Sequence, residues 1–271
     1  MPSWRQLPAP WLLSRDTFRD VAESGFTTRP FLPIRRAYLD VLDAGRRRRM
    51  IHGLVEVDVT DVRPAVKAAG LSFTAYLAWC VARAVAADPV VQAYRQGRRL
   101  VLFDDVDVNT QLEQDHAGQK IVQSLVLRAA NRKSAADLTT ELRAAQHDPG
   151  VGRDRHRGAA AFASLPGFVR ALPWRVVMAN PFWFRRFGGT VGLSSVGMFG
   201  RGGWAIPIAP CTLMVAVGGT SRKPRFVSGD LVERELLALT LGFDHTVVDG
   251  APAARFASRL AELVEAGPQP T

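Results

Sequence analysis

Apolar and polar residues follow regular spacings along most of the chain, and these spacings predict a mixture of strands and helices. Residues 54–62, LVEVDVTDV, alternate as in a half-buried strand. The segment SFTAYLAWCVARAVAADP, which starts at Ser72, carries apolar residues at helical spacing, and Pro89 ends this predicted helix. RLVLFDDVDVNTQL predicts a strand, a turn and a second strand, and KIVQSLVLRAA predicts another strand. SAADLTTELRAAQ predicts a helix capped by Ser134.

The C-terminal third has the clearest pattern. CTLMVAVGG and LVERELLALTLGFDH predict strands, and a hairpin turn is expected at Ser228-Gly229-Asp230. A helix then begins at Asp249 or Gly250 and ends at Gly267. Its expected apolar face consists of Ala253, Phe256, Ala257, Leu260, Leu263 and Val264. Because strands and helices are mixed rather than strictly alternating, we expect an α+β fold with a mixed sheet.

The segment from Leu165 to Phe187 departs from both periods. It interleaves large apolar side chains with arginines, and Pro173 and Pro181 divide it into short pieces. Three interpretations remain open. The segment is a helical hairpin packed on the core or on a neighbouring subunit, a lid over an apolar substrate channel, or a contact with a membrane surface.

Composition and charge narrow the class of partner. The chain has 271 residues, 47% of them apolar, and a formal net charge of +10. This excess of arginine and lysine favours anionic partners such as phosphorylated cofactors, nucleic acid or an acidic membrane surface. Nucleic acid is disfavoured because the positive charge forms no patch interleaved with aromatic residues. The run Arg46–Arg49 predicts a solvated turn, with a phosphate clamp as the alternative.

Two features indicate the compartment. The only cysteines are Cys80 and Cys211, which predicts neither a disulfide framework nor a metal cluster and fits a reducing environment. The first residues lack the basic and apolar regions of a secretory signal, and no apolar run approaches the roughly 18 residues that a membrane span needs. We therefore expect a cytoplasmic protein.

Candidate chemistry centres on His245, in the stretch GFDHTVVDG. This histidine lies where a long apolar strand turns into a helix, a place that holds a side chain rigidly while its tip stays accessible. A neutral imidazole has a reference pKa of about 6.5, so it accepts protons near neutral pH. Asp249 is expected to hold the turn through an ion pair or a cap, and Gly250 to permit a turn that a β-carbon would block. The alternative is an ordinary surface histidine.

The glycine-rich stretch from Gly188 to Gly203, GGTVGLSSVGMFGRGG, is a second candidate. It lacks the spacing of a phosphate-binding loop, of a dinucleotide-binding turn and of a hydrolase nucleophile elbow. One of its serines is instead a candidate hydrogen-bond donor to an oxyanion, and the alternative is a strand followed by a flexible turn. No histidine pair has zinc-ligand spacing, so we expect no metal.

Three stretches together closely resemble the catalytic domain of the 2-oxoacid dehydrogenase dihydrolipoamide acyltransferases. They are GTVGLSSVGMFG, PCTLMVAVGGTSRKP and LTLGFDHTVVDGAPAARFASRLAELVE. That domain shares its fold and HxxxDG motif with chloramphenicol acetyltransferase. The similarity extends from about Arg29 to Ala266, and its last block is the most specific. The expected domains are therefore an N-terminal arm at 1–28 and an acyltransferase-like domain at 29–271, with an insertion at about 148–187.

The resemblance implies an α+β, chloramphenicol acetyltransferase-like mixed-sheet sandwich with flanking helices, assembled as a homotrimer with active sites between subunits. His245 would be the general base that takes a proton from the thiol of coenzyme A or dihydrolipoamide. Ser194, from the neighbouring subunit, would stabilise the tetrahedral intermediate. Asp249 would be the motif carboxylate that supports the site, paired with Arg35. The implied cofactor is coenzyme A, as an acyl-CoA substrate, without a metal.

Departures from the family pattern qualify the substrate. We find no lipoyl domain, so a carrier domain would act in trans. Thr246 replaces the arginine that usually follows the motif histidine, and AGQKIVQSLVL replaces a segment near the family's substrate channel. The leading hypothesis is a stand-alone acyltransferase that uses a free or carrier-bound acceptor. A catalytically silent trimeric binding protein and a biosynthetic enzyme that reuses the fold for another condensation or rearrangement are the alternatives.

Overall fold

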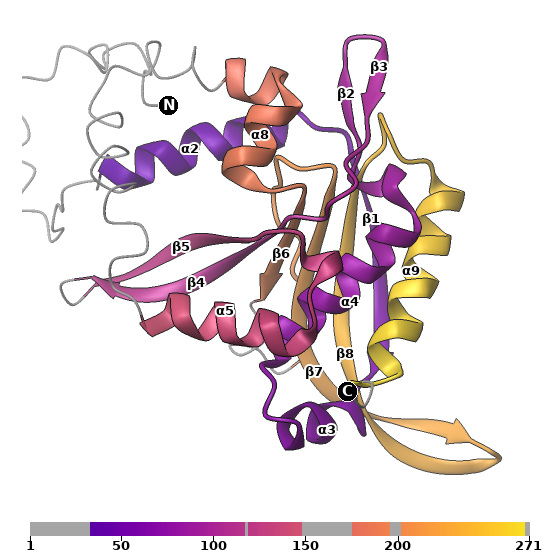
Figure 1. Ribbon diagram of the computed structural model, residues 1–271. Coiled ribbons are helices and arrows are strands. Elements are labelled where there is room, and N and C mark those ends of the chain that lie inside the picture. The colour runs from indigo at the N-terminus through magenta and orange to yellow at the C-terminus, as the bar shows by residue number, and fades with distance from the viewer. Residues whose placement is uncertain (1–32, 117–118, 148–174, 196–201, 269–271) are drawn as a thin grey trace, which may run out of the picture.

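A six-stranded mixed sheet organises the fold (Figure 1). The computed structural model describes residues 33–116, 119–147, 175–195 and 202–268. The strand order is β1-β8-β7-β6-β4-β5; β6 runs parallel to β4 and β7, and the other neighbours are antiparallel. The strands are β1 (Met50–Asp58), β4 (Val108–His116), β5 (Gln119–Leu127), β6 (Val191–Ser195), β7 (Leu213–Val227) and β8 (Asp230–Asp244). The α+β class with a mixed sheet is confirmed.

The helices α4, α5 and α9 cover one face of the sheet (Figure 1). The described helices are α2 (Pro33–Arg46), α3 (Val62–Ala68), α4 (Phe73–Ala87), α5 (Ala135–His147), α8 (Pro181–Gly188) and α9 (Gly250–Glu265). Short 3-10 turns follow α4 at Pro89–Gln92 and β5 at Ala130–Arg132, and β2 (Tyr94–Gln96) and β3 (Arg99–Val101) form a separate hairpin. In the described chain no single helix is long and apolar enough to span a bilayer; only α3 and α4 together reach that criterion, with a 112° bend.

The predicted helices and the predicted hairpin turn are confirmed. Ser72 caps α4 by accepting a hydrogen bond from the amide of Ala75, and Ser134 Oγ accepts one from the amide of Asp137. Ser228 and Gly229 both take positive φ angles between β7 and β8, as a tight hairpin turn requires. The strand predicted at 54–62 is displaced, because it runs from 50 to 58. Val62 instead opens helix α3, where it is buried together with Val66.

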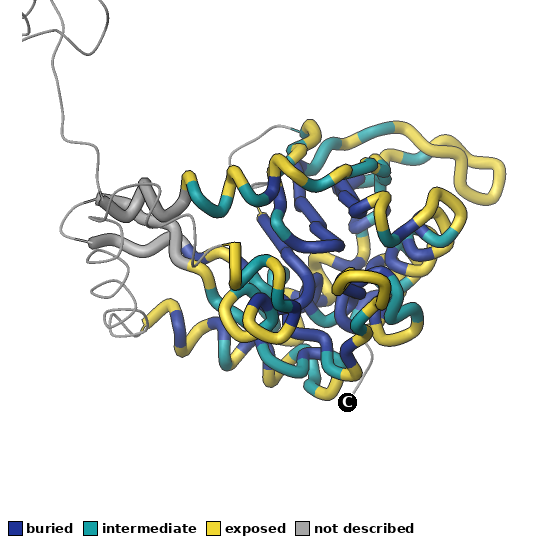
Figure 2. Tube along the Cα trace, turned by 90° about the horizontal axis from the view of Figure 1, so that it is seen from above, coloured by how far each residue is buried: buried dark blue, intermediate teal, exposed yellow. Residues whose placement is uncertain are grey.

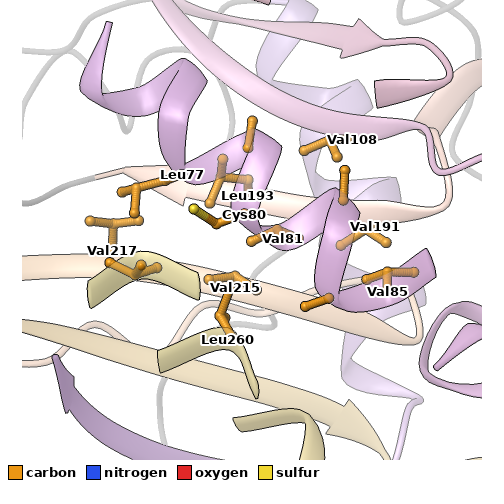
Figure 3. Packing of buried hydrophobic residues seen from close by; sticks show 14 of the residues in the cluster. Leu77, Cys80, Val81, Val85, Val108, Val191, Leu193, Val215, Val217 and Leu260 are labelled. Carbon is orange, nitrogen blue, oxygen red and sulfur yellow. The ribbon is translucent and has the colours of Figure 1, made fainter. Parts of the chain in front are cut away.

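The core lies between the sheet and the helices α4 and α9 (Figure 3). Alternate strand residues point to this side, and they are Val191, Leu193, Val215, Val217, Leu239 and Leu241. They pack against Leu77, Cys80, Val81 and Val85 of α4 and Leu260 of α9. Burying each large aliphatic side chain is worth about 1.5–3 kcal/mol, so this layer fixes the strands that carry the site.

The residues between these positions point to the opposite face of the sheet. They include Gly192, Ser194, Ala216 and Thr240, which are small or polar. Figure 2 shows that burial follows the middle of the sheet, whereas the far end of the β7–β8 hairpin is exposed. The predicted arm at 1–28 and most of the insertion at 148–187 lie outside the described residues.

Candidate active site

His245 lies at the end of β8, in the turn that leads to α9. Its amide donates to the carbonyl of Arg49 at 2.8 Å, and its side chain is 48% exposed. Its Nδ1 lies 3.1 Å from the carbonyl oxygen of Val248. Because a carbonyl oxygen only accepts, this contact places the imidazole proton on Nδ1 and leaves the lone pair on Nε2. The ring is therefore oriented as a general base requires.

The turn around His245 is built on the buried residue Asp244. Its amide donates to the carbonyl of Thr212 at 2.9 Å. Its carboxylate accepts hydrogen bonds from the amide of Thr246 at 3.0 Å and from the hydroxyl of Thr246 at 2.8 Å. Its carbonyl accepts from the amides of Val247 and Val248. Asp244 thus fixes the backbone on both sides of the imidazole.

Arg48 neutralises this buried carboxylate. Its Nη1 lies 2.8 Å from Asp244 Oδ2, and its guanidinium lies 5.2 Å from the ring centroid of Tyr94. Burial alone would raise the pKa of Asp244, but the hydrogen bonds from Thr246 and the ion pair with Arg48 hold this pKa below its ordinary value. The prediction of a solvated turn is therefore wrong for Arg48, because a buried carboxylate from a distant strand binds it.

The predicted supporting residues have mixed outcomes. Asp249 precedes α9 but makes no capping hydrogen bond; its side chain is 85% exposed and lies 3.5 Å from His245 Nδ1. The structure describes only the backbone of Arg35, in α2, so its pairing with Asp249 stays a prediction. Gly250 does not need a positive φ, and a β-carbon there would meet nothing within 4 Å. The expectation that a β-carbon would block this turn is therefore wrong for the isolated chain.

Ser194 lies on β6, with only 7% of its surface exposed. Its hydroxyl donates to Gln111 Oε1 at 3.3 Å. The strand register aligns Ser194 with Ala216 and Ala216 with Thr240, which lies five residues before His245. From strand spacing and rise, the backbones of Ser194 and His245 are roughly 19 Å apart in one chain. Their side chains therefore do not meet within a subunit.

The described end of the segment 165–187 consists of two helical pieces that meet at Asn180, with Pro181 opening α8. Asn180 Oδ1 caps α8 by accepting from the amides of Phe182 and Trp183 at 3.0 and 3.2 Å. One face of α8 is buried through Phe184, and the other exposes Phe182, Trp183 and Phe187. Residues 175–187 are thus largely helical, which does not decide between the three interpretations, and residues 165–174 lie outside the described part.

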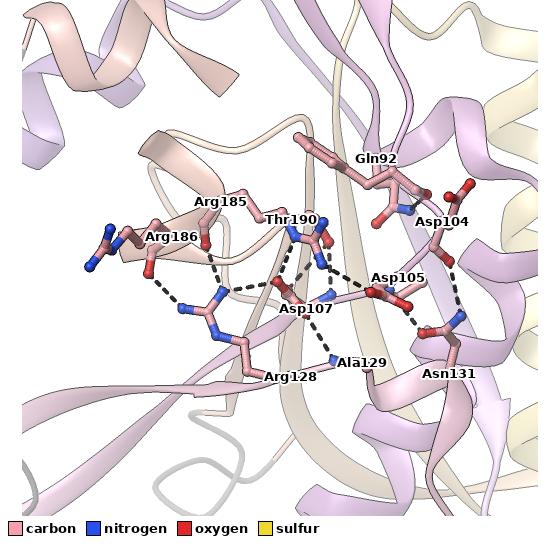
Figure 4. A network of polar contacts seen from close by, with 12 residues as sticks. Gln92, Asp104, Asp105, Asp107, Arg128, Ala129, Asn131, Arg185, Arg186 and Thr190 are labelled. Atoms are coloured by element: carbon pink, nitrogen blue, oxygen red, sulfur yellow. Dashed lines mark hydrogen bonds and ion pairs between the residues drawn. The ribbon is translucent and has the colours of Figure 1, made fainter. Parts of the chain in front are cut away.

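A polar network fixes the C-terminal end of α8 to the sheet (Figure 4). The buried carboxylate of Asp107 accepts from Arg128 and Arg185, both at 2.9 Å, and from the amide of Ala129 at 2.9 Å. Arg128 also donates to the carbonyls of Arg185 and Arg186 at 2.8 and 2.5 Å. Burial would raise the pKa of Asp107, but these donors hold it below its ordinary value.

Neither this network nor the Arg48–Asp244 pair was identified from the sequence, because their partners are distant along the chain. In the described ranges, no group of three histidine, cysteine or carboxylate side chains is placed to hold a metal ion. Cys80 and Cys211 are both free and buried. Burial raises the pKa of the Cys211 thiol to about 11, so this thiol is not a nucleophile near neutral pH.

Comparison with known proteins finds sequence similarity to one family in the C-terminal part of the chain. The model of the 2-oxoacid dehydrogenases acyltransferase (catalytic domain) matches residues 186–270. The succinyltransferase component of the 2-oxoglutarate dehydrogenase complex of Saccharomyces cerevisiae is 35% identical over 79 residues, covering 29% of this chain and 17% of that protein. The chain matches less than a fifth of the length of such relatives.

Solved structures show a similarity in fold over most of the chain. A probable dihydrolipoamide acetyltransferase from Listeria monocytogenes has a TM-score of 0.66 at 20% identity, covering 92% of this chain and 98% of that one. The cubic core of the pyruvate dehydrogenase multienzyme complex has a TM-score of 0.63 at 20% identity, covering 91% and 94%. The resemblance to the catalytic domain of the 2-oxoacid dehydrogenase acyltransferases is thus confirmed over residues 186–270, and the described chain has the fold of their solved cores.

Proposed function

We propose that the protein transfers an acyl group between a thioester, such as an acyl-CoA, and a thiol or another small acceptor. The observation that carries this proposal is the contact of His245 Nδ1 with the carbonyl of Val248, which leaves Nε2 as a proton acceptor on an accessible ring. The relatives that match residues 186–270 are named as acyltransferase components, which supports the same reaction class.

The proposed reaction needs no acyl-enzyme. His245 Nε2 accepts the proton of the acceptor thiol while the sulfur of that thiol attacks the thioester carbonyl. The hydroxyl of Ser194 donates a hydrogen bond to the resulting oxyanion, which is worth roughly 3–4 kcal/mol of the barrier. The tetrahedral intermediate then expels the donor thiolate, and this thiolate receives the proton from His245. Asp244, Arg48 and Thr246 keep the ring in position throughout.

This mechanism requires two subunits, because Ser194 and His245 are roughly 19 Å apart in one chain. We propose a homotrimer in which the serine of one subunit faces the histidine of the next. The exposed apolar residues Phe182, Trp183 and Phe187 of α8 offer a surface for such a contact. The similarity to a cubic multienzyme core supports an assembly of trimers, and a lipoyl carrier domain in trans would be one acceptor.

The test is the substitution His245→Ala. Release of free thiol from acyl-CoA, measured with added dihydrolipoamide and with other thiol acceptors, should fall by about a hundredfold or more. The mass of the assembly, measured by light scattering, should stay unchanged. His147→Ala is the matched control, since His147 lies exposed at the end of α5. An unchanged rate in His245→Ala would overturn the proposal.

A further inference from the structure

A basic pocket of about 340 Å³ lies beside the turn that carries His245. Its walls come from α2, from the turn before β1, and from the helical piece at 175–179. Asp244 and Thr246, the residues on either side of His245, both line it. The proposed chemistry uses Arg48 to hold the turn, but it gives no role to the other arginines of this pocket.

The charges of the pocket are not fully balanced. Four arginines and three aspartates line it. Arg48 is committed to Asp244 through the ion pair at 2.8 Å, which removes both charges from ligand binding. In the described part of the chain, no ion pair engages Arg47, Arg49 or Arg175. These three guanidinium groups outnumber the remaining carboxylates and come from two separate segments.

The pocket lies next to His245, the proposed general base. The carbonyl of Arg49 accepts a hydrogen bond from the amide of His245 at 2.8 Å. The turn that contains Arg47–Arg49 and the turn that contains His245 are therefore in direct contact. A ligand held by these arginines therefore has its remaining part within reach of the imidazole. The volume of about 340 Å³ exceeds what a single oxyanion fills and lies at the lower end of the range of small-molecule sites.

We infer that Arg47, Arg49 and Arg175 bind an anionic group, a phosphate or a carboxylate, of the acyl donor or the acceptor. Guanidinium groups bind both anions through paired, charge-assisted hydrogen bonds. The inference rests on the proposed acyl transfer for the identity of the ligand. It assigns to part of the arginine run the role of an anion clamp, while Arg48 serves the catalytic turn.

Calorimetric binding of acetyl-CoA tests the pocket directly. The double variant Arg49→Gln/Arg175→Gln should bind acetyl-CoA or succinyl-CoA about tenfold or more weakly than the wild type. Arg98→Gln is the matched control, because Arg98 is exposed in the turn between β2 and β3, away from the pocket. Equal affinities of the wild type and the double variant for both thioesters would overturn the inference.

Two comparisons identify the source of the anion. If the phosphates of coenzyme A occupy the pocket, the double variant loses affinity for acetyl-CoA but not for S-acetylpantetheine, which has no phosphate. If a carboxylate of the acyl group occupies it, the double variant loses the preference of the wild type for succinyl-CoA over acetyl-CoA. Either pattern supports the inference.

Pyrophosphate separates the pocket from the proposed reaction. If the protein consumes no thioester but pyrophosphate raises the melting temperature of the wild type and not of the double variant, the anion pocket stands and the proposed function fails. The opposite outcome is that thioester is consumed, that pyrophosphate shifts the melting temperatures of wild type and variant equally, and that both proteins bind the two thioesters with equal affinity. In that case the pocket fails and the proposed function stands.

Discussion

The guanidinium of Arg48 lies 2.8 Å from the carboxylate of Asp244, the residue immediately before His245. The two residues are far apart in sequence, and Asp244 is almost fully buried. The pair joins the turn before β1 to the turn after β8. It therefore couples the orientation of His245, the proposed general base, to the packing of the sheet edge.

Replacing Arg48 with glutamine should destabilise the protein by about 3 kcal/mol, because it leaves a buried carboxylate without its partner. Urea unfolding measures this loss, and Arg98→Gln should show no comparable change. Arg48→Met combined with Asp244→Asn should recover part of the lost stability, since no unpaired charge then remains. If Arg48→Gln unfolds at the wild-type urea concentration, the pair contributes nothing to stability.

Ser194→Ala should lower kcat by about a hundredfold to a thousandfold with little change in KM, because in the proposed mechanism the hydroxyl acts on the developing oxyanion. If the site lies between subunits, co-expressing Ser194→Ala with His245→Ala should restore activity. Random mixing in a cyclic trimer leaves about one interface in four with both residues intact. Purified mixed assemblies that stay as inactive as either variant alone would argue against a shared site.

Asp107→Asn should loosen α8 by weakening its contacts with Arg128 and Arg185. We expect a lower melting temperature and faster proteolysis near residues 175–188. Asp104→Asn is the control, because the Asp104 side chain is exposed and, among the described residues, only its backbone carbonyl is hydrogen-bonded, by Asn131. Identical proteolysis of the two variants would show that the network does not hold α8.

Acid should remove the stability that two buried carboxylates provide. The folded state holds the pKa of Asp107 and Asp244 below the ordinary value of 3.8, so it binds protons less readily than the unfolded chain. Their contribution is fully present above that value and is lost as the pH falls through the lowered folded pKa values. Urea unfolding between about pH 6 and about pH 3 should show this loss, with a smaller slope in Asp107→Asn.

Trp183→Ala combined with Phe187→Ala should weaken the proposed subunit contact, because both side chains are about half exposed in the isolated chain. Sedimentation should show smaller species at low protein concentration, and activity should fall with the assembly. Leu100→Ser serves as the control, since Leu100 is similarly exposed on the β2–β3 hairpin. An unchanged assembly would remove α8 from the subunit interface.

The sequence determined the local elements and the identity of the candidate base. Helical spacing identified α4 and α9, alternation and turn residues identified the β7–β8 hairpin, and the motif around His245 marked the end of β8. These features depend on neighbours within a few residues, so local patterns reveal them. The same patterns placed Val62 in a strand, because alternation continues into the first turn of α3.

The tertiary structure decided which distant residues meet. Nothing in the run of four arginines distinguishes Arg48 as the partner of Asp244, and nothing near Asp107 indicates that Arg128 and Arg185 converge on it. Strand register also separates Ser194 from His245 within one subunit, although both motifs are clear in the sequence. Such pairings follow from strand order and burial, and the low dielectric of the interior selects which charges must pair.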